Sequence, residues 1–157
     1  MQRECEASVV VHAPPEAVWS VISDVTRVGE WSGECRGGAW IPPSNEASVG
    51  ARFRGRNRRG GMRWTRVNEV LQADRPGHFR WKTVKAGPYP DSVEWAVALE
   101  AVEGGTKVTE GFRVVVLPRW MEAAIGIAMP AHKDRTQDLA DDLGRLKALV
   151  ESELRAA

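Results

Sequence analysis

The sequence predicts an α+β fold in which a curved antiparallel sheet wraps around one long C-terminal helix. Three observations support this prediction. Short segments of alternating apolar and polar residues, separated by turn residues, occupy most of residues 35–117, which is typical of an antiparallel meander. A single long amphipathic helix follows, over Asp134–Leu154. The length of 157 residues fits one domain, so we expect a single domain over residues 1–157.

The start of the chain predicts a strand followed by two short helices. Residues 4–12 end in a β-branched run that favours a strand. Pro14 and Pro15 end the strand and suit the first turn of a helix over Pro15–Ile22, in which apolar residues recur at helical spacing. A second short helix is predicted over Asp24–Glu30. The expected order is therefore strand, helix, helix.

Six further strands are predicted before the C-terminal helix. They cover residues 35–41, 51–58, 63–73, 78–84, 92–102 and 106–117, with turns at Gly60–Gly61, Arg75–Gly77 and Gly104–Gly105. A Gly- and Pro-rich loop over Ala86–Asp91 contains the only tyrosine, Tyr89, which we expect outside any internal cavity.

The end of the chain predicts a helix that covers the sheet. Residues 119–129 are short and apolar, which favours a loose helix or a lid, and Pro130 allows a new helix to start. Beyond it, apolar residues advance by four, three, four and four positions and form one stripe: Leu139, Leu143, Leu146, Val150 and Leu154. A sheet with one apolar face needs a cover, and this helix is the only long amphipathic element.

Composition and motifs exclude several classes of protein. Hydrophobic residues make up 43% and charged residues 27% of the chain, and the net charge is +1, which argues against a DNA-binding protein. No apolar run is long enough for a transmembrane segment, and no signal peptide is visible, so we expect a cytoplasmic protein with reduced Cys5 and Cys35. His12 and His132 have no evident partner, and no metal or cofactor motif is present; we expect neither a metal nor a cofactor.

The opening Ala13-Pro14-Pro15-Glu16-Ala17-Val18-Trp19, followed by Asp24 and Trp31, resembles that of the polyketide cyclase/dehydrase group. This group belongs to the START-like superfamily, also called Bet v 1-like, SRPBCC or helix-grip. Residues 104–109 and 143–151 are similar to its late hairpin and terminal helix. The resemblance covers about residues 4–152 and implies a helix-grip fold with an internal cavity for a hydrophobic small molecule. It implies no particular chemistry, because relatives include cyclases, carriers and proteins with protein partners.

Alternation predicts which large side chains face this cavity. Seven of the eleven aromatic residues are tryptophan, and such large side chains need a core to fill or a cavity to line. The expected ligand-binding residues on the strands are Trp40, Phe53, Trp64, Trp81, Trp95 and Phe112, with Trp120, Ile125 and Met129 near the mouth. The alternative is that these residues simply fill the core.

Glu110 shares its strand face with Val108, Phe112 and Val114, so its carboxyl group is expected on the apolar side. A buried carboxyl group needs a partner or has a raised pKa, which is the environment of a general acid or base. Arg66 and Asn68 share a face with Trp64, and in a cyclase or dehydratase they could hold an enolate oxygen. However, Val67 and Leu71 have the opposite parity, so the facing of this strand is ambiguous. Glu110 has a structural alternative, in which it turns outward or pairs with an arginine.

Residues 51–66 carry seven arginines and no acid. Arg52, Arg54, Arg56 and Arg58 fall on one face of a strand, which we expect to be the outer face. This strip could bind RNA or an anionic surface. The simpler alternative is a solvated outer face. Its charges would prevent the sheet edge from pairing with another strand, or would form ion pairs with acids such as Glu69 on the next strand.

The predicted function is binding of a hydrophobic small molecule, such as a polyketide, lipid or isoprenoid, by a carrier or sequestering protein. The first alternative is a cyclase, aromatase or dehydratase that uses Glu110 without a cofactor. The second is an interaction module that acts through the arginine-rich hairpin.

Overall fold

The computed structural model describes all 157 residues and has the element order that the sequence predicts. The strands are β1 (Glu4–Val11), β2 (Cys35–Trp40), β3 (Arg52–Arg59), β4 (Met62–Asp74), β5 (His78–Thr83), β6 (Ser92–Val102) and β7 (Gly105–Val116). The helical elements are α1 (Pro15–Ile22), the 3-10 helix η1 (Val25–Glu30), α2 (Arg119–Ala128), the 3-10 helix η2 (Pro130–Lys133) and α3 (Thr136–Ala156). The ambiguous segment 119–129 is therefore mostly a regular helix.

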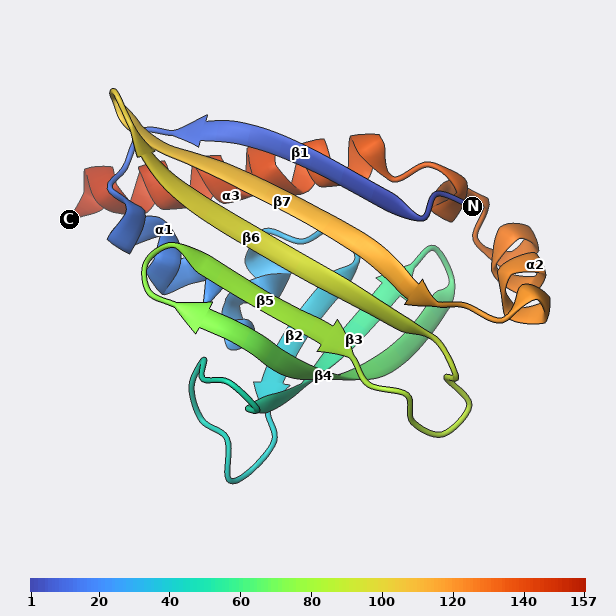
Figure 1. Cartoon of the computed structure of the whole chain (residues 1–157). Coiled ribbons are helices and arrows are strands. Elements are labelled where there is room, and N and C mark those ends of the chain that lie inside the picture. The colour runs from blue at the N-terminus through green and yellow to red at the C-terminus, as the bar shows by residue number, and fades with distance from the viewer.

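The seven strands form one antiparallel sheet in the order β1-β7-β6-β5-β4-β3-β2. Strands β2 to β7 follow one another as a meander, and β1 lies at the edge beside β7, with Val9 opposite Val108. The sheet curves strongly, and α3 runs along its hollow side (Figure 1). This arrangement confirms the predicted fold class.

The short helices close one end of the hollow (Figure 1). Asp24 caps η1, because its carboxylate accepts a hydrogen bond from the backbone N–H of Thr26 at 3.0 Å. The backbone of η1 lies directly on β2: a Cβ atom at Gly38 would overlap Val25 O, and one at Gly29 would overlap Arg36 O. Only glycine allows the two backbones to approach this closely.

Helix α3 buries the predicted apolar stripe against the sheet and the short helices. Leu139, Leu143, Leu146 and Val150 are each at most 2% exposed. The stripe ends one turn earlier than the sequence predicts, because Leu154 is 45% exposed beyond the sheet. This helix packs mainly against the edge strand β1 and less against β7.

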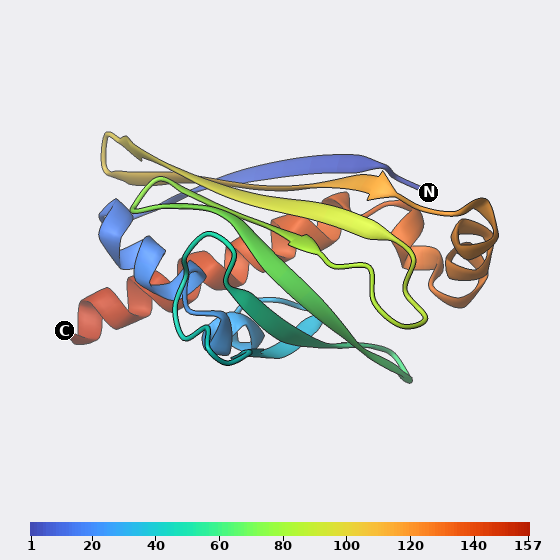
Figure 2. The same ribbon diagram turned by 60° about the horizontal axis from the view of Figure 1, so that its bottom comes forward.

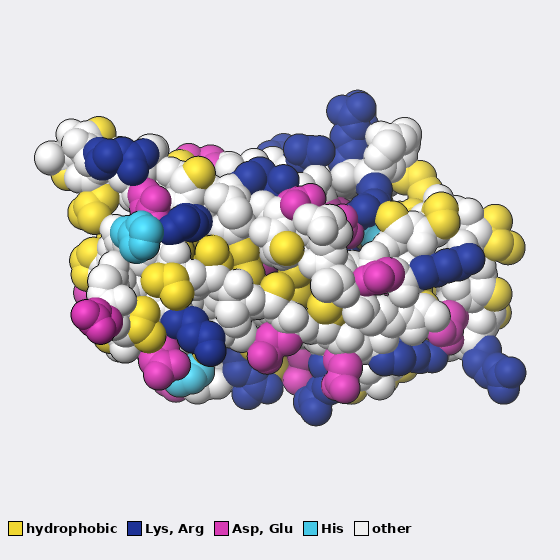
Figure 3. Space-filling view, turned by 90° about the horizontal axis from the view of Figure 1, so that it is seen from above, with side chains coloured by type: hydrophobic (Ala, Val, Ile, Leu, Met, Phe, Trp, Pro, Cys, Tyr) yellow, Lys and Arg dark blue, Asp and Glu magenta, His cyan; other side chains and the backbone are white.

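The opposite end of the hollow carries α2, the β3–β4 turn and the β5–β6 loop (Figure 2). No helix in the structure is both long and apolar enough to cross a membrane. Charged side chains of both signs are interspersed over the face that carries β1 and α3 (Figure 3), consistent with the net charge of +1.

The arginine strip of β3 faces outward, as its alternation predicts. Arg54, Arg56 and Arg58 are exposed and form no ion pair, whereas Arg52 bonds to Glu69 with Nη2 and Oε2 2.9 Å apart. Arg59 has the other parity and turns inward to Asp138. The unpaired outer charge is therefore smaller than the seven arginines of this hairpin suggest.

Candidate ligand-binding cavity

A cavity of about 500 Å³ lies between the curved sheet and the helices. Of its 36 lining residues, 22 are hydrophobic. Most come from η1 and the segment after it, from strands β3 to β7, from α2 and from the segment before α3, and a few come from the N-terminus, α1, β2 and α3. A cavity of this size and apolar character falls in the range of small-molecule sites.

A row of aromatic rings crosses the sheet side of the cavity. Trp81 and Trp95 are directly opposite on β5 and β6, and their nearly parallel rings, at 7°, have centroids 6.3 Å apart. Phe53 and Phe112 extend the row to β3 and β7, with centroid distances of 6.4 Å to Trp81 and 5.3 Å to Trp95. These four residues line the cavity, and they present a continuous, polarizable wall.

Of the other predicted binding residues, Trp64, Ile125 and Met129 also line the cavity. Trp40 and Trp120 do not, so the sequence prediction differs from the structure at these two positions. Trp40 packs edge-on against Phe53 at the end of β2 and is partly buried against the core. Trp120 lies on the outer side of α2 and is 65% exposed.

Glu110 points into the cavity from β7 and is 3% exposed. Its Oε2 atom is fully buried and has no hydrogen-bond partner. Burial raises the pKa of Glu110 to about 8; the charge of Asp142 on α3 adds to the rise, and that of Arg135 opposes it. At neutral pH, Glu110 is therefore mostly a protonated acid inside an apolar chamber.

A buried ion pair lies at the β5–β6 loop. Arg66 Nη1 is 2.8 Å from Asp91 Oδ2, and the two side chains are 11% and 7% exposed. The guanidinium group also lies 4.8 Å from the ring centroid of Tyr89. Contrary to the expectation from its Gly- and Pro-rich loop, Tyr89 lines the cavity, and the loop contacts Arg66 through both Tyr89 and Asp91.

The ambiguity of β4 is resolved in favour of Arg66 and Asn68. Asn68 is directly opposite Phe53, so both face the cavity, and Asn68 is 6% exposed. These polar side chains do not adjoin Glu110, however. Strands β5 and β6 separate β4 from β7, which places them three strand spacings, or about 14 Å, apart along the sheet.

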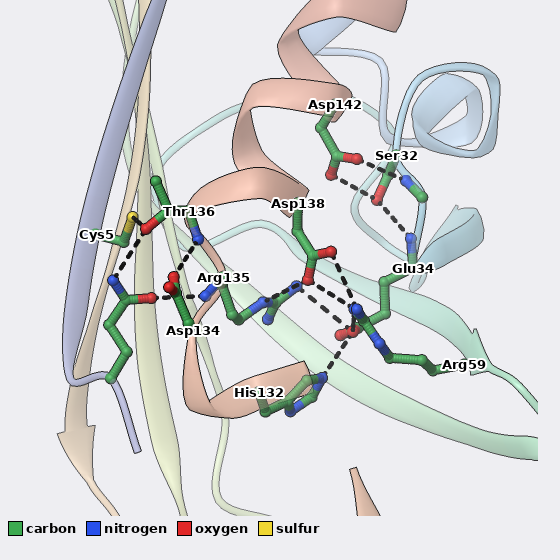
Figure 4. A network of polar contacts seen from close by, with 12 residues as sticks. Cys5, Ser32, Glu34, Arg59, His132, Asp134, Arg135, Thr136, Asp138 and Asp142 are labelled. Atoms are coloured by element: carbon green, nitrogen blue, oxygen red, sulfur yellow. Dashed lines mark hydrogen bonds and ion pairs between the residues drawn. The ribbon is translucent and has the colours of Figure 1, made fainter. Parts of the chain in front are cut away.

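A second polar cluster joins the start of β2 to the start of α3 (Figure 4). Glu34 Oε2 accepts a hydrogen bond from His132 Nε2 at 2.8 Å and lies 3.3 Å from Arg59 Nη1 and 3.5 Å from Arg135 Nη2. Burial raises the pKa of Glu34, but the hydrogen bond from His132 and the positive charge of Arg135 outweigh it and bring the pKa to about 2. His132, expected to lack a partner, therefore has one.

The polar lining residues that sequence reasoning missed include Glu34, Asp91, His132, Arg135 and Asp142. Each lines the cavity through a contact between segments far apart in the chain; Glu34 and His132, for example, are 98 positions apart. Such pairs cannot be predicted from the spacing of residues within a short stretch of sequence. No group of three or more His, Cys, Asp or Glu side chains is arranged to hold a metal ion.

The element order and the curved sheet around the C-terminal helix are those of the Bet v 1-like helix-grip fold. Residues 2–151 match the family model described as polyketide cyclase/dehydrase and lipid transport. The chain therefore belongs to this family, which lies within the START-like superfamily that the sequence resembles. A comparison with curated proteins finds no match.

Solved structures show the same fold. The protein TTHA0849 from Thermus thermophilus has a TM-score of 0.72 at 16% identity, with 96% of this chain and 98% of that chain covered. The Polyketide_cyc-like protein Cgl2372 from Corynebacterium glutamicum has a TM-score of 0.58 at 26% identity, with coverage of 96% and 93%. Ara h 8.0201 has a TM-score of 0.60 at 12% identity, with coverage of 95% and 97%.

Proposed function

We propose that this protein binds a hydrophobic small molecule in the cavity and acts as its carrier or sequestering protein. A polyketide, a lipid or an isoprenoid would suit the site. The observation that supports this function best is the 500 Å³ cavity with its row of four aromatic rings. The family description, which includes lipid transport, agrees with such a role.

Native mass spectrometry of the freshly purified protein tests this function. A bound molecule that survives gentle ionisation is expected as an added mass. A titration with Nile red, an uncharged apolar dye, provides a second readout, because its emission rises when it leaves water. A protein that retains no molecule and does not enhance the dye emission would contradict the proposal.

One observation favours an enzyme as the second candidate. Glu110 is a buried, unpaired carboxyl group inside the cavity, with a pKa raised to about 8. In a cyclisation or dehydration, it would exchange a proton with an activated C–H group or a departing hydroxyl group. Arg66 or Asn68 would hold a carbonyl oxygen at the other side, so the substrate would have to span the cavity.

The enzyme candidate predicts turnover of a polyketone-like substrate. Replacing Glu110 by Gln should lower the rate by at least about 100-fold, which is the usual contribution of a general acid or base, while ligand binding persists. Equal rates in the two proteins would exclude Glu110 as the acid or base.

A further inference from the structure

Five buried side-chain polar atoms in this protein have no hydrogen-bond partner: Trp31 Nε1, Arg66 Nε, Asp91 Oδ1, Glu110 Oε2 and Arg135 Nε. All five belong to residues that line the cavity. Buried polar atoms are nearly always paired, because an unpaired one loses its hydrogen bonds to water and gains none in return. Their restriction to one cavity indicates that its occupant supplies the missing hydrogen bonds.

Two of these atoms lie at the end of the cavity formed by the β5–β6 loop. The ion pair between Arg66 and Asp91 uses Nη1 and Oδ2, and Arg66 Nη2 lies 3.4 Å from the carbonyl oxygen of Asp91. The donor Nε of Arg66 and the acceptor Oδ1 of Asp91 remain without a hydrogen bond. The side-chain N–H of Asn68 donates a hydrogen bond to the carbonyl oxygen of Arg66, and Asn68 Oδ1 forms no hydrogen bond. We name these three residues the loop pole.

The other three atoms lie on the side of α3. Glu110 on β7 is close enough to Asp142 and Arg135 for their charges to act on it. Trp31 is tied to α3, because its carbonyl oxygen accepts a hydrogen bond from Arg145 Nε at 2.8 Å. We name Trp31, Glu110 and Arg135 the helix pole. It offers the N–H donor of Trp31 and a carboxyl group that can donate or accept, whereas Arg135 Nε faces Asp138 Oδ2 at 3.6 Å, just beyond hydrogen-bond distance.

The distance between the two poles follows from the number of β6 residues that lie between them. Glu110 is directly opposite Val97, and Asp91 immediately precedes the first residue of β6. Six residues of extended strand span about 20 Å. Trp95, which belongs to the aromatic row, lies between these two levels. The Arg135 guanidinium lies 5.3 Å from the ring centroid of Trp95 and 5.6 Å from that of Phe112. An elongated molecule that contacts both poles would therefore rest its apolar middle on the parts of the aromatic row that this guanidinium leaves free.

The charges of the cavity favour an uncharged occupant. Arg66 is neutralised by Asp91, and Arg135 lies 3.5 Å from Glu34 and 3.6 Å from Asp138. Arg63, a lining arginine without an ion pair, is exposed to solvent. An anionic head group would find no free buried cation, and burial of an unpaired charge is strongly unfavourable.

From these observations we propose that the cavity selects an elongated, uncharged hydrophobic molecule with a hydroxyl or carbonyl oxygen near each end, one for the loop pole and one for the helix pole. The proposal rests on the ligand-binding function given above and narrows it. Fatty acids and phospholipids, which carry a charged head group, are excluded as preferred ligands.

Three probes of equal chain length test this selectivity: an α,ω-alkanediol, the primary alcohol and the carboxylic acid. Their dissociation constants for the full chain are measured at neutral pH by isothermal titration calorimetry, over a homologous series of lengths. Each satisfied hydrogen bond contributes about 1 kcal/mol, so the best diol should bind about fivefold tighter than its alcohol. The acid, ionised in solution, should bind more weakly than the alcohol.

Replacing Glu110 by Leu removes the oxygens of the helix pole at similar size. The advantage of the diol over the alcohol should then disappear, while Trp120→Phe, on the outer side of α2, leaves it unchanged. The double variant Arg66→Met, Asp91→Leu removes the loop pole and should have the same effect; thermal unfolding checks that each variant folds. If a variant does not fold, the proposal is judged by the order of affinities of the diol, the alcohol and the acid for the unchanged protein.

An acid that binds as tightly as the diol would overturn the proposal, as would equal binding of diol and alcohol, the result expected if cavity waters satisfy the five atoms. These outcomes differ from failure of the proposed function. If Nile red binds but the selectivity is absent, only this proposal fails. If neither the dye nor any probe binds, both fail.

Discussion

Nε2 of His132 and Oε2 of Glu34 lie 2.8 Å apart and join the segment before α3 to the start of β2. The same oxygen lies within 3.5 Å of one nitrogen each of Arg59 and Arg135 (Figure 4). One carboxylate thus connects two arginines and a histidine from two distant parts of the chain. Because the contact bridges the sheet and the terminal helix beside the cavity, it stabilises the arrangement on which the cavity depends.

Acid should destabilise the protein through Glu34. Its pKa is about 2 in the folded protein, below the ordinary value of 4.5, so its contribution is complete above about pH 4.5 and is lost as the pH falls toward 2. Glu34→Gln should lower the free energy of unfolding at neutral pH by about 2 kcal/mol, because it leaves partly buried cations without their carboxylate. Urea unfolding at several pH values measures both effects.

Glu46→Gln is the matched control, since Glu46 is exposed and forms no ion pair. It should leave the free energy of unfolding within about 0.5 kcal/mol of the unchanged protein. If Glu34→Gln has the same acid dependence as the unchanged protein, Glu34 does not carry the acid sensitivity assigned to it.

Glu110 should have the opposite effect on the pH dependence of stability. Its pKa is raised to about 8 by burial, so between about pH 4.5 and 8 the folded state holds a proton that the unfolded state has released. The free energy of unfolding should therefore decrease as the pH rises, by about 1.4 kcal/mol per pH unit in this window. Glu110→Gln should remove this slope, whereas Glu100→Gln, at an exposed position of β6, should retain it.

Much of the fold is predictable because its strands alternate cleanly. The side chains of β3, β5, β6 and β7 keep one parity where they face the cavity, so Phe53, Trp81, Trp95 and Phe112 are identified from the sequence alone. Strand β4 is ambiguous for a physical reason. A bulge between Val70 and Gln72 changes the parity, so the positions on its two sides that face inward do not share one alternation.

The polar residues of the cavity are much less predictable. Asp91 lies in a loop with no regular spacing, and its burial depends on Arg66, 25 positions away. Trp40 and Trp120 show the opposite kind of error, in which residues predicted to line the cavity do not. An inward-facing position does not establish contact with the cavity, because Trp40 packs against the ring of Phe53 instead. In α2, apolar residues occur on the exposed side as well, so the sequence does not indicate which face Trp120 occupies.

Tryptophan fluorescence should separate the cavity tryptophans from the others. A ligand on the aromatic wall will contact Trp81 and Trp95, so Trp95→Phe should reduce the change in tryptophan emission that Nile red causes. The exposed Trp120 serves as the control, because Trp120→Phe changes a side chain outside the cavity lining. Loss of the response in Trp120→Phe and its retention in Trp95→Phe would place the dye elsewhere.

Arg58 and Arg63 are directly opposite on β3 and β4, and neither forms an ion pair. Like charges at opposite positions of an antiparallel pair repel, so Arg58→Glu should stabilise the protein by about 0.5 kcal/mol at low salt. The gain should decline at about 1 M salt, where screening is strong. Arg54→Glu is the control, since Val67 lies opposite it on β4. Equal gains in both variants, measured by thermal unfolding, would exclude the pairwise repulsion.

Gly38 should tolerate no side chain. A Cβ atom there would overlap Val25 O, a backbone atom of η1 that a rotamer change cannot move. Gly38→Ala should therefore push η1 away from β2 and lower the free energy of unfolding by about 2 kcal/mol or more. Because Val25 and Val28 of η1 line the cavity, Nile red binding should weaken as well.

Gly144 is the matched control for this substitution, with an expected change of opposite sign. It lies within α3, is exposed, and a Cβ atom there would meet nothing within 4 Å. Glycine inside a helix costs about 0.5–1 kcal/mol relative to alanine, so Gly144→Ala should raise the free energy of unfolding by that amount and leave dye binding unchanged. If Gly38→Ala is as stable as Gly144→Ala, the backbone of η1 is not held against β2 by this glycine, and the closed end of the cavity must depend on side-chain packing instead.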